Sequence, residues 1–411
     1  MNYEFFIAKR IISSKAYKSS ISAPIIKIGI AAIAIGMVVM MVTVAISIGL
    51  QQKIRDKVVA FNGHVTISNY DSNNSQESLN PISINQDFYP EFKTVKGIKH
   101  VQGVASKFGV IRTETDFEGV NLKGVGADYN WDYFKQFLVE GKLPDYTQKR
   151  NENVLISKYL ANRLHFKVGD KFQMFFAKDD PEKLPNIITY NISGIFNSGF
   201  QDLDAQYLIG DIRHLQRINR WEKDQIGNFE IFINDYNDLE EKGAEIHKNI
   251  SSLLDSQTIT DRYYSIFEWI KIFDKNTYGI IGIMVLIAGF NMITALLVLI
   301  LERTQMIGVL KTLGSSNWSI RKIFLYNASY LILLGLLWGN ILGLGLLFAQ
   351  KYFKLFPLDP SVYYVTEAPV YINFGYILAL NIGVLLLCLL MLLVPSYIIT
   401  KISPVKAIRF N

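Results

Sequence analysis

Few side chains in this sequence could carry out covalent chemistry. The five histidines, His64, His100, His165, His214 and His247, are scattered, and their spacing does not match a metal site. We expect each of them to lie on the surface or in a loop. The sequence has no G-x-x-x-x-G-K-[ST] phosphate-binding loop and no G-x-S-x-G nucleophile motif. It therefore predicts no catalytic residue, no metal ligand and no cofactor-binding residue.

The segment Glu302–Lys322 is instead suited to receiving mechanical force. It is polar and basic, and it separates an apolar run that ends in ALLVLIL from one that begins with IFLYNASYLILL. Such a segment cannot lie in hydrocarbon, because its polar groups would lose their hydrogen bonds to water. Its pattern predicts a short helix that ends at Gly314 and a second helix that starts at Ser315-Ser316-Asn317. A rigid helix at the inner end of a membrane bundle can receive force from a soluble motor.

Four long apolar runs predict helices that cross a membrane. Average soluble domains have about 25% charged residues, whereas this chain has 19%. The deficit is concentrated in Ile28–Leu50, Gly279–Leu301, Ile323–Gln350 and Tyr371–Thr400. Each run exceeds the roughly 18–20 apolar residues needed to cross about 30 Å of hydrocarbon. A buried helix of a soluble protein explains one such run but not four.

The basic residues predict how these spans are oriented. The net charge is +4 in residues 1–27, +3 in residues 302–322 and +3 in residues 401–411, which leaves −4 for residues 51–278 of the total of +6. Positively charged loops stay in the cytoplasm. We therefore expect both termini and the 302–322 loop inside, and residues 51–278 and 351–370 outside. Because the basic residues adjoin membrane spans, we interpret them as contacts with membrane lipid, not with nucleic acid.

These patterns divide the chain into spans, loops and one large outer domain. We expect a cytoplasmic amphipathic helix at 1–24, spans at 25–50, 279–301, 323–350 and 371–400, a cytoplasmic loop at 302–322, an outer loop at 351–370 and a cytoplasmic tail at 401–411. The outer domain covers 51–278. Its ends, 51–113 and 228–263, have an α/β pattern, 114–227 is a β-rich insertion, and 264–278 is a membrane-proximal helix.

Each α/β end of the outer domain has the pattern of a β-α-β unit. At the first end, residues 63–70 and Val101–Thr113 read as strands, and the spacing of Phe88, Phe92 and Val95 predicts a helix over 84–95. At the second end, 228–233 and 257–263 read as strands and 238–254 as a helix. KFQMFF (171–176) and NIITYNISGIF (186–196) read as strands of the insertion.

Small and polar residues in the spans predict contacts between helices. Glycines four residues apart let two helices approach closely, as in the G-x-x-x-G motif. The third span has three glycines with this spacing, Gly335, Gly339 and Gly343. We expect a tight seam within the chain or with a second chain; chance glycines in a flexible helix are the alternative. Asn291, Asn340 and Asn381 predict hydrogen bonds between spans.

Motifs along nearly the whole chain match one family. GFNMITALLVLILERTQMIGVLKTLGSS (289–316) is the most specific, and it is similar to the family's second span and coupling helix. VEGKLP (139–144) and NVLISKYLANRLHFKVGD (153–170) resemble its outer-domain signature. FIAKRIISSK (6–15) and SPVKAIRF (403–410) resemble its opening helix and its closing pattern. The chain thus resembles the lipoprotein-releasing permeases of the LolC/LolE type, within the MacB/FtsX class of ABC transporters.

The resemblance implies a fold and an assembly. The fold would be an α-helical membrane protein with four transmembrane helices and, between the first two, a large α+β periplasmic domain. That domain would have a porter-like α/β part and an inserted β-rich part. In the inner membrane, the chain would pair with a second permease, the same or a related chain, and bind two copies of a cytoplasmic ABC ATPase. The complex would extract triacylated lipoproteins and pass them to a periplasmic carrier. ATP would bind to the ATPase, so the permease itself would be no enzyme and need no cofactor.

The matched coupling helix supplies candidate residues for docking the ATPase. We expect Gln305–Gly314 to lie in a groove of that subunit, with an apolar face inside the groove and charged residues that set the register. The assigned residues are Glu302, Arg303, Met306, Val309, Leu310, Lys311, Leu313 and Gly314.

A lipoprotein substrate also requires a site for its acyl chains. Each buried CH₂ group contributes about 0.8 kcal/mol to membrane anchoring, so extraction needs an apolar holding site as well as ATP. We place this site at the outer ends of the first two spans, where flexible methionines suit variable chains. The assigned residues are Met40, Met41, Val44, Ile48, Ile283 and Met284. Ordinary packing or lipid-facing roles are the alternative for each.

The segment AKDDPEKLPN (177–186) lies at the position of the family's carrier-binding hook. Its sequence does not repeat that of the hook, so an ordinary surface hairpin is the alternative. The residues assigned to carrier docking are Asp179, Asp180, Pro181, Leu184 and Pro185.

Three other functions are compatible with four spans and an outer domain. One is a MacB-like exporter permease for peptides or toxins, although such proteins usually carry a fused ATPase before the first span. Another is an FtsX-like transmitter that activates a cell-wall hydrolase, although its outer domain is usually smaller. An envelope receptor without an ATPase is the third, and the coupling-helix match does not support it.

Overall fold

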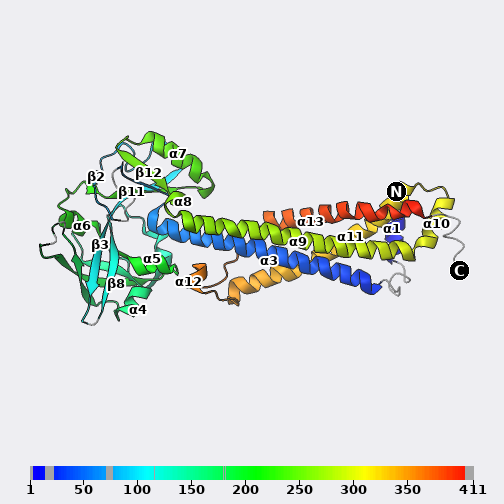
Figure 1. The fold of residues 1–411 in the computed structure, drawn as a ribbon, viewed down its shortest axis with the longest axis horizontal. Helices are drawn as coiled ribbons and strands as arrows, with labels where there is room; N and C mark the ends of the chain where they lie inside the picture. Colours follow the sequence, from blue (N-terminus) through cyan, green and yellow to red (C-terminus); the bar gives the residue numbers. More distant parts are fainter. Residues whose placement is uncertain are drawn as a thin grey trace. The chain divides into compact units, whose positions relative to one another are not determined.

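The structure, a computed structural model, describes residues 3–13, 23–70, 77–114, 116–178, 180 and 182–402. The chain forms two compact units. The helical unit contains Met1–Gln51, Trp269–Pro357 and Ala368–Asn411. The α/β unit contains Gln52–Glu268 and Leu358–Glu367. Figure 1 follows the chain through both.

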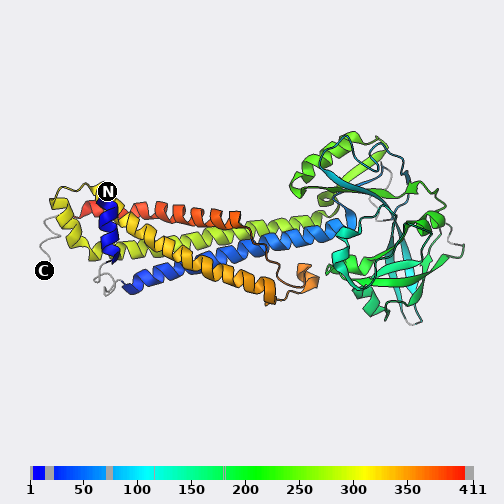
Figure 2. The same ribbon diagram turned by 180° about the vertical axis from the view of Figure 1, so that it is seen from behind.

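Four long helices run side by side in the helical unit (Figures 1 and 2). They are α3 (Ala23–Asn62), α9 (Tyr264–Glu302), α11 (Asn317–Phe353) and α13 (Phe374–Ser396). Each is part of a helical segment long and apolar enough to cross a membrane. The 40 residues of α3 give a length of about 60 Å at 1.5 Å per residue. Because this is about twice the hydrocarbon thickness, α3 extends well beyond the apolar run that predicted it.

The short helices of this unit lie around the bundle. They are α1 (Tyr3–Ser13), α10 (Thr304–Thr312) and α14 (Ile398–Lys401). The amphipathic α1 packs against α11: the Ser319 hydroxyl donates to Glu4 at 2.9 Å, and the Phe5 and Tyr326 rings meet edge to face at 5.9 Å. Ala8 and Ile11 are buried, so the apolar face of α1 joins the core of the bundle. The matched tail motif, 403–410, lies outside the described residues.

The three glycines of the third span face the first span. A Cβ atom built on Gly335 would lie 2.8 Å from Cβ of Ile33, and one on Gly339 would lie 2.7 Å from Cβ of Met37. A Cβ atom on Gly343 would lie 3.1 Å from the sulfur of Met41. Two helices therefore meet at a distance that only glycine permits, and the seam is intramolecular.

Two of the three span asparagines form the expected contact between helices. Asn340 and Asn381 exchange amide hydrogen bonds of 2.7 and 3.0 Å, which join α11 to α13. The amide of Asn291 donates to the carbonyl of Ile287 in its own helix, at 2.9 Å. An asparagine can satisfy its donor locally in a helix, so its presence in a span does not require a partner helix.

The described residues 63–262 form a ten-stranded sheet with helices around it (Figure 1). The strand order is β12-β1-β11-β3-β4-β9-β6-β8-β5, and β7 pairs with β3 and β8. The strands are β1 (Val65–Asn69), β3 (Ile98–Arg112), β4 (Phe117–Val125), β5 (Leu138–Gly141), β6 (Asn153–Ser157), β7 (Lys171–Phe176), β8 (Asn186–Phe196), β9 (Tyr207–Asp211), β11 (Asn228–Ile233) and β12 (Leu254–Thr258). A separate pair joins β2 (Ile82–Ser83) to β10 (Gln225–Ile226).

Helices and single turns connect these strands. They are α4 (Lys158–Arg163), α5 (Gln201–Gln206), α6 (Ile212–Asn219), α7 (Leu239–Asn249) and α8 (Ile259–Arg262), with 3₁₀ turns at Trp131–Tyr133, Lys135–Phe137 and Tyr236–Asp238. The strand β3 is 15 residues long. Its first half pairs with β11 and its second half with β4 and β7. The expected insertion 114–227 therefore continues the sheet of the two α/β ends.

The prediction of a helix over 84–95 was wrong. The structure has turns there, although Phe88, Phe92 and Val95 are buried as their spacing suggested. Pro90 interrupts the pattern, because the residue before a proline avoids the helical conformation. The Phe88 and Phe92 rings stack at 5.2 Å. The second end is a β-α-β unit, but α7 ends at Asn249, and 257–263 belongs partly to β12 and partly to α8.

The connection between the third and fourth spans contributes ten residues to the α/β unit. Leu358–Glu367, with the helical turn α12 (Pro360–Tyr363), belongs to this unit. Lys57 donates from Nζ to the carbonyl of Tyr364 at 2.8 Å, and the Tyr364 ring lies 4.4 Å from that of Phe200. The chain consequently passes between the two units four times.

The glycine seam predicts a position-specific effect of larger side chains. We expect Gly339→Leu to lower the thermal melting temperature of the purified protein, because overpacking a close contact typically costs about 1–3 kcal/mol. Gly345→Leu is the matched control on the same helix, since a Cβ atom at Gly345 meets no atom within 4 Å. Equal melting temperatures for the two variants would contradict the seam.

Candidate docking surface, apolar groove and outer cavity

One side of the helix α10 is buried against the bundle, and the other side is exposed. Ile307 and Leu310 are buried, and Met306 packs against the core of the bundle. Val309 and Leu313 are 45% and 77% exposed. The expected docking face is therefore divided: Val309 and Leu313 are open to a partner, while Met306 and Leu310 hold α10 on the bundle.

Lys311 contacts the end of the fourth span. Its Nζ donates to the carbonyls of Ile399 at 2.8 Å, Thr400 at 3.3 Å and Ile402 at 2.8 Å. These carbonyls lie where α14 ends, and the last carbonyls of a helix have no partner within it. Burial lowers the pKa of Lys311. Lys311, which was expected to help set the register of the docked ATPase, therefore binds backbone carbonyls of its own chain.

A second cation of the same region contacts the preceding turn. Arg321 donates from Nε to the hydroxyl of Ser396 and from Nη2 to the carbonyl of Leu393, each at 3.0 Å. Pro395 lies inside the end of α13 and cannot donate a backbone hydrogen bond. This contact was not predicted, because no local pattern in the sequence shows that Arg321 lies beside the end of the fourth span.

The other assigned residues lie at the ends of α10. Arg303 precedes its first turn, and Glu302 is exposed at the end of α9. Gly314 has φ +88°, a left-handed conformation that ends the helix as predicted. Ser316 then caps α11 by accepting from the amide of Ser319 at 3.2 Å. Trp318 in the first turn of α11 is half-exposed and was not assigned.

The residues assigned to acyl chains separate into three groups. Met40 and Met41 are buried in the core of the bundle, and Met284 packs against that core. Ile283 is exposed. Val44 and Ile48 line an apolar groove of about 320 Å³.

This groove lies between three spans of the helical unit. The first span contributes Val44, Ser47 and Ile48, the second Asp274, Thr277, Tyr278, Ile281 and Val285, and the fourth Tyr376, Ala379, Leu380, Gly383, Val384 and Leu387. Gln51 donates to the carboxylate of Asp274 at 2.7 Å. The groove therefore combines apolar walls with polar groups of the first two spans. Its fourth-span wall was not foreseen, because no local pattern indicates which spans are neighbours.

The segment 177–186 follows β7 in the sequence and leads to β8, and its described residues 177, 178 and 182–185 are exposed. Asp180 pairs with Lys183 at 2.9 Å, and Leu184 and Pro185 are exposed. Asp179 and Pro181 lie outside the described residues.

The sheet next to this segment has an exposed apolar face. The strand registers place Phe108, Phe117 and Ile187 on the same side of β3, β4 and β8. All three side chains are more than half exposed. We refer to them as the apolar sheet face.

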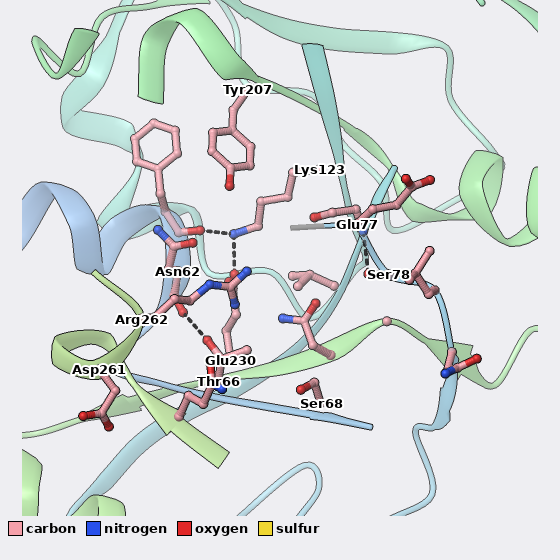
Figure 3. A pocket seen from close by; sticks show the side chains of 18 residues that line it. Asn62, Thr66, Ser68, Glu77, Ser78, Lys123, Tyr207, Glu230, Asp261 and Arg262 are labelled. Carbon is pink, nitrogen blue, oxygen red and sulfur yellow. Dashed lines mark hydrogen bonds and ion pairs between the residues drawn. The ribbon is translucent and has the colours of Figure 1, made fainter. Parts of the chain in front are cut away.

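A polar cavity of about 230 Å³ lies in the α/β unit, where α3 ends and β1 begins (Figure 3). Lys123 and Glu230 form an ion pair in its wall, with 2.6 Å between Nζ and Oε1. Burial lowers the pKa of Lys123, and the carboxylate of Glu230 opposes this shift. Thr66, Asn62 and Arg262 also line the cavity.

The histidines were expected on the surface or in loops. His64 lies in the connection between α3 and β1 but is buried, whereas His214 is buried within α6, which the expectation had excluded. His64 accepts at Nδ1 from the amide of Ile233 at 3.3 Å, and burial lowers its pKa to about 4. His214 Nε2 lies 3.0 Å from the carbonyl of Asn151. Among the described residues, no group of three or more His, Cys, Asp or Glu side chains could hold a metal ion.

The fold defines a class: a multi-pass membrane protein with a large α/β domain. Residues 28–248 match the family model described as MacB-like periplasmic core domain. Residues 278–404 match the model described as FtsX-like permease C-terminal. The first match alone covers more than half of the chain, and the chain therefore belongs to the MacB-like family with an FtsX-like permease C-terminal region.

Relatives of similar length resemble it throughout. The chain is 24% identical to "Lipoprotein-releasing system transmembrane protein LolC" of Buchnera aphidicola subsp. Schizaphis graminum, over 92% of both chains. It is 21% identical to the protein of the same name from Neisseria meningitidis serogroup B, over 99% of both chains. It is 22% identical to "Lipoprotein-releasing system transmembrane protein LolE" of Haemophilus influenzae, again over 99% of both.

Proposed function

We propose that this chain is a permease subunit of an ABC transporter that releases lipoproteins from the inner membrane. The observation that carries the proposal is the similarity to LolC and LolE proteins over 92–99% of the chain, because it includes the spans, the α/β domain and α10 together. ATP would be bound and hydrolysed by a separate ATPase subunit. The absence of a phosphate-binding loop from the sequence agrees with this division of labour.

The proposal includes an orientation. The basic segments 1–27, 302–322 and 401–411 would lie in the cytoplasm, and the α/β unit in the periplasm. The match to a periplasmic core domain supports the second placement. A second permease, the same or a related chain, would complete the membrane part of the complex.

Docking of the ATPase would use the open side of α10. Val309 and Leu313 are one helical turn apart and exposed, as helix-in-groove recognition requires. Leu310 and Lys311 attach the other side of α10 to the bundle. Closure of the ATPases would therefore move α10 together with the end of the fourth span, a rigid-body form of coupling.

The apolar groove would hold an acyl chain during release. Its walls replace part of the hydrocarbon that the chain leaves, at about 0.8 kcal/mol per buried CH₂ group. Ser47, Thr277 and Asp274 offer hydrogen-bonding groups to the polar end of the substrate. We no longer include Met40 and Met41 in this site, because both are buried in the core.

Transfer to a periplasmic carrier would use the segment 177–186. Leu184 is exposed there, and the apolar sheet face lies on the strands that carry and adjoin the segment. An exposed apolar surface of this kind is typical of a protein contact.

A MacB-like exporter of peptides or toxins is the second candidate, and the MacB-like core domain favours it. An FtsX-like transmitter of signals to a cell-wall hydrolase is the third, and the match to the FtsX-like model favours it. The three functions differ in what fails when the protein is lost.

Depletion of the protein in its own cells tests the proposal. We expect outer-membrane lipoproteins to accumulate in the inner membrane, because their extraction would stop. Membrane fractionation followed by quantification of lipoproteins measures this. Normal sorting together with chained cells would favour the transmitter, and normal sorting with loss of peptide export would favour the exporter.

The docking side of α10 can be tested with two exposed residues. We expect Val309→Asp/Leu313→Asp to reduce co-purification of the ATPase at least tenfold, because two carboxylates would have to be desolvated in its groove. Leu253→Asp is the control, since Leu253 is 75% exposed in the α/β unit. Normal recovery of the ATPase with the double variant would refute docking by this face.

The groove can be tested with a photocrosslinking amino acid. Placed at Ile48, it should form adducts with an acylated lipoprotein before ATP is added, because this side chain lines the groove. Placed at Leu337, which is exposed on the third span and does not line the groove, it should form few. Equal yields at both positions would remove the groove from the proposal.

A further inference from the structure

The outer end of α3 is attached to the sheet by a buried ion pair. Lys123 on β4 and Glu230 on β11 have side chains that are 3% and 4% exposed. Lys123 also donates from Nζ to the carbonyl of Phe61, in the last turn of α3 (Figure 3). The final carbonyls of a helix lack partners within it and carry the negative end of its dipole. The ammonium group therefore joins three elements: α3, β4 and β11.

Further hydrogen bonds hold this pair in place. Gln102 on β3 donates from Nε2 to Glu230 at 2.9 Å, and its Oε1 accepts from the amide of Asn130 at 2.9 Å. The register pairs Gln102 with Glu230 across β3 and β11. Both charged groups thus have partners besides each other.

The start of the second span is bound at the same place. The Tyr263 hydroxyl, directly before α9, donates to the side-chain oxygen of Asn62 at 2.9 Å. The amide of Ile259 donates to the carbonyl of His64 at 2.9 Å. The outer ends of α3 and α9 therefore share one polar junction, and the cavity lies beside it.

Apolar packing also contributes at this junction. The Phe61 ring packs among aromatic side chains, 5.1 Å from Phe134 and 5.8 Å from Phe196. These contacts are apolar and involve no polar group of the helix end, whereas Lys123 gives the Phe61 carbonyl a charge-assisted hydrogen bond, which is stronger than a neutral one. A buried ion pair contributes little net stability compared with apolar residues of the same volume, and its best attested role is to specify one arrangement.

We propose that Lys123 and Glu230 are positioning residues of the transporter. They fix the direction of the end of α3 against the sheet, so that a movement of the first span becomes a movement of the α/β unit. This inference rests on the proposed function, because it concerns how that function is driven.

Removing both charges together tests the inference. Lys123→Met/Glu230→Met is compared with wild type in the full complex, permeases with ATPases, reconstituted in lipid vesicles that carry an acylated lipoprotein. We expect a melting temperature and an ATP hydrolysis rate close to wild type, because no unpaired charge remains buried, but at least a tenfold loss of lipoprotein released per ATP. Lys107→Met/Glu77→Met is the matched control: this pair, 3.0 Å apart, joins β3 to residues before β2 and should leave release unchanged.

Release per ATP at the wild-type level in the Lys123→Met/Glu230→Met complex would overturn the inference. If that variant does not fold, the single variant Lys123→Gln is measured in its place. A fivefold or greater loss of lipoprotein released per ATP supports the inference, and release at the wild-type level refutes it.

Hydrogen exchange gives an answer that does not require lipoprotein. ATP should change exchange at both α10 and β1 in wild type, but only at α10 in the variant, and an unchanged response at β1 would contradict the inference. The proposed function itself would be contradicted by a different result, namely a wild-type complex that hydrolyses ATP without releasing lipoprotein.

Discussion

A helix that crosses a bilayer satisfies its backbone hydrogen bonds internally except at its two ends. In this protein, cationic side chains from other elements contact carbonyls at the ends of the first and the fourth spans. Lys311 and Arg321 contact the end of the fourth span, and Lys123 contacts the end of the first. These cations attach each of the two span ends to a neighbouring element. The transmission of movement that we propose depends on those attachments, because a span with free ends could move without displacing anything else.

The helix α10 illustrates how one short sequence serves two contacts. Leu310 and Leu313 are equally apolar, and the sequence gives no reason to separate them. Only the packing of α10 on the bundle buries the first and leaves the second open. The same packing brings Lys311 to the carbonyls after α13. A helix that is held on one side and open on the other can move with its own bundle while it presents a surface to another subunit.

Features that depend on residues close together in the chain could be predicted from the sequence. The four apolar runs, the helix end at Gly314 and the strands at 171–176, 186–196 and 228–233 depend on neighbours in the chain, and the structure has each of them. The prediction of a helix over 84–95 overlooked a local signal: Phe88 and Phe92 have helical spacing, yet Pro90 between them prevents the helix and the two rings stack instead. Features that depend on distant residues could not be predicted. The fourth-span wall of the groove and the burial of His64 and His214 result from packing that no local signal encodes.

The connection Leu358–Glu367 has a consequence for how the α/β unit is encoded. This unit is built from two separated segments of the chain, Gln52–Glu268 and Leu358–Glu367. The Tyr364 carbonyl accepts from Lys57, and the Tyr364 ring packs against that of Phe200. A fragment that contained only residues 52–268 would therefore lack part of its own packing, and the ring of Phe200 would lose one of its neighbours.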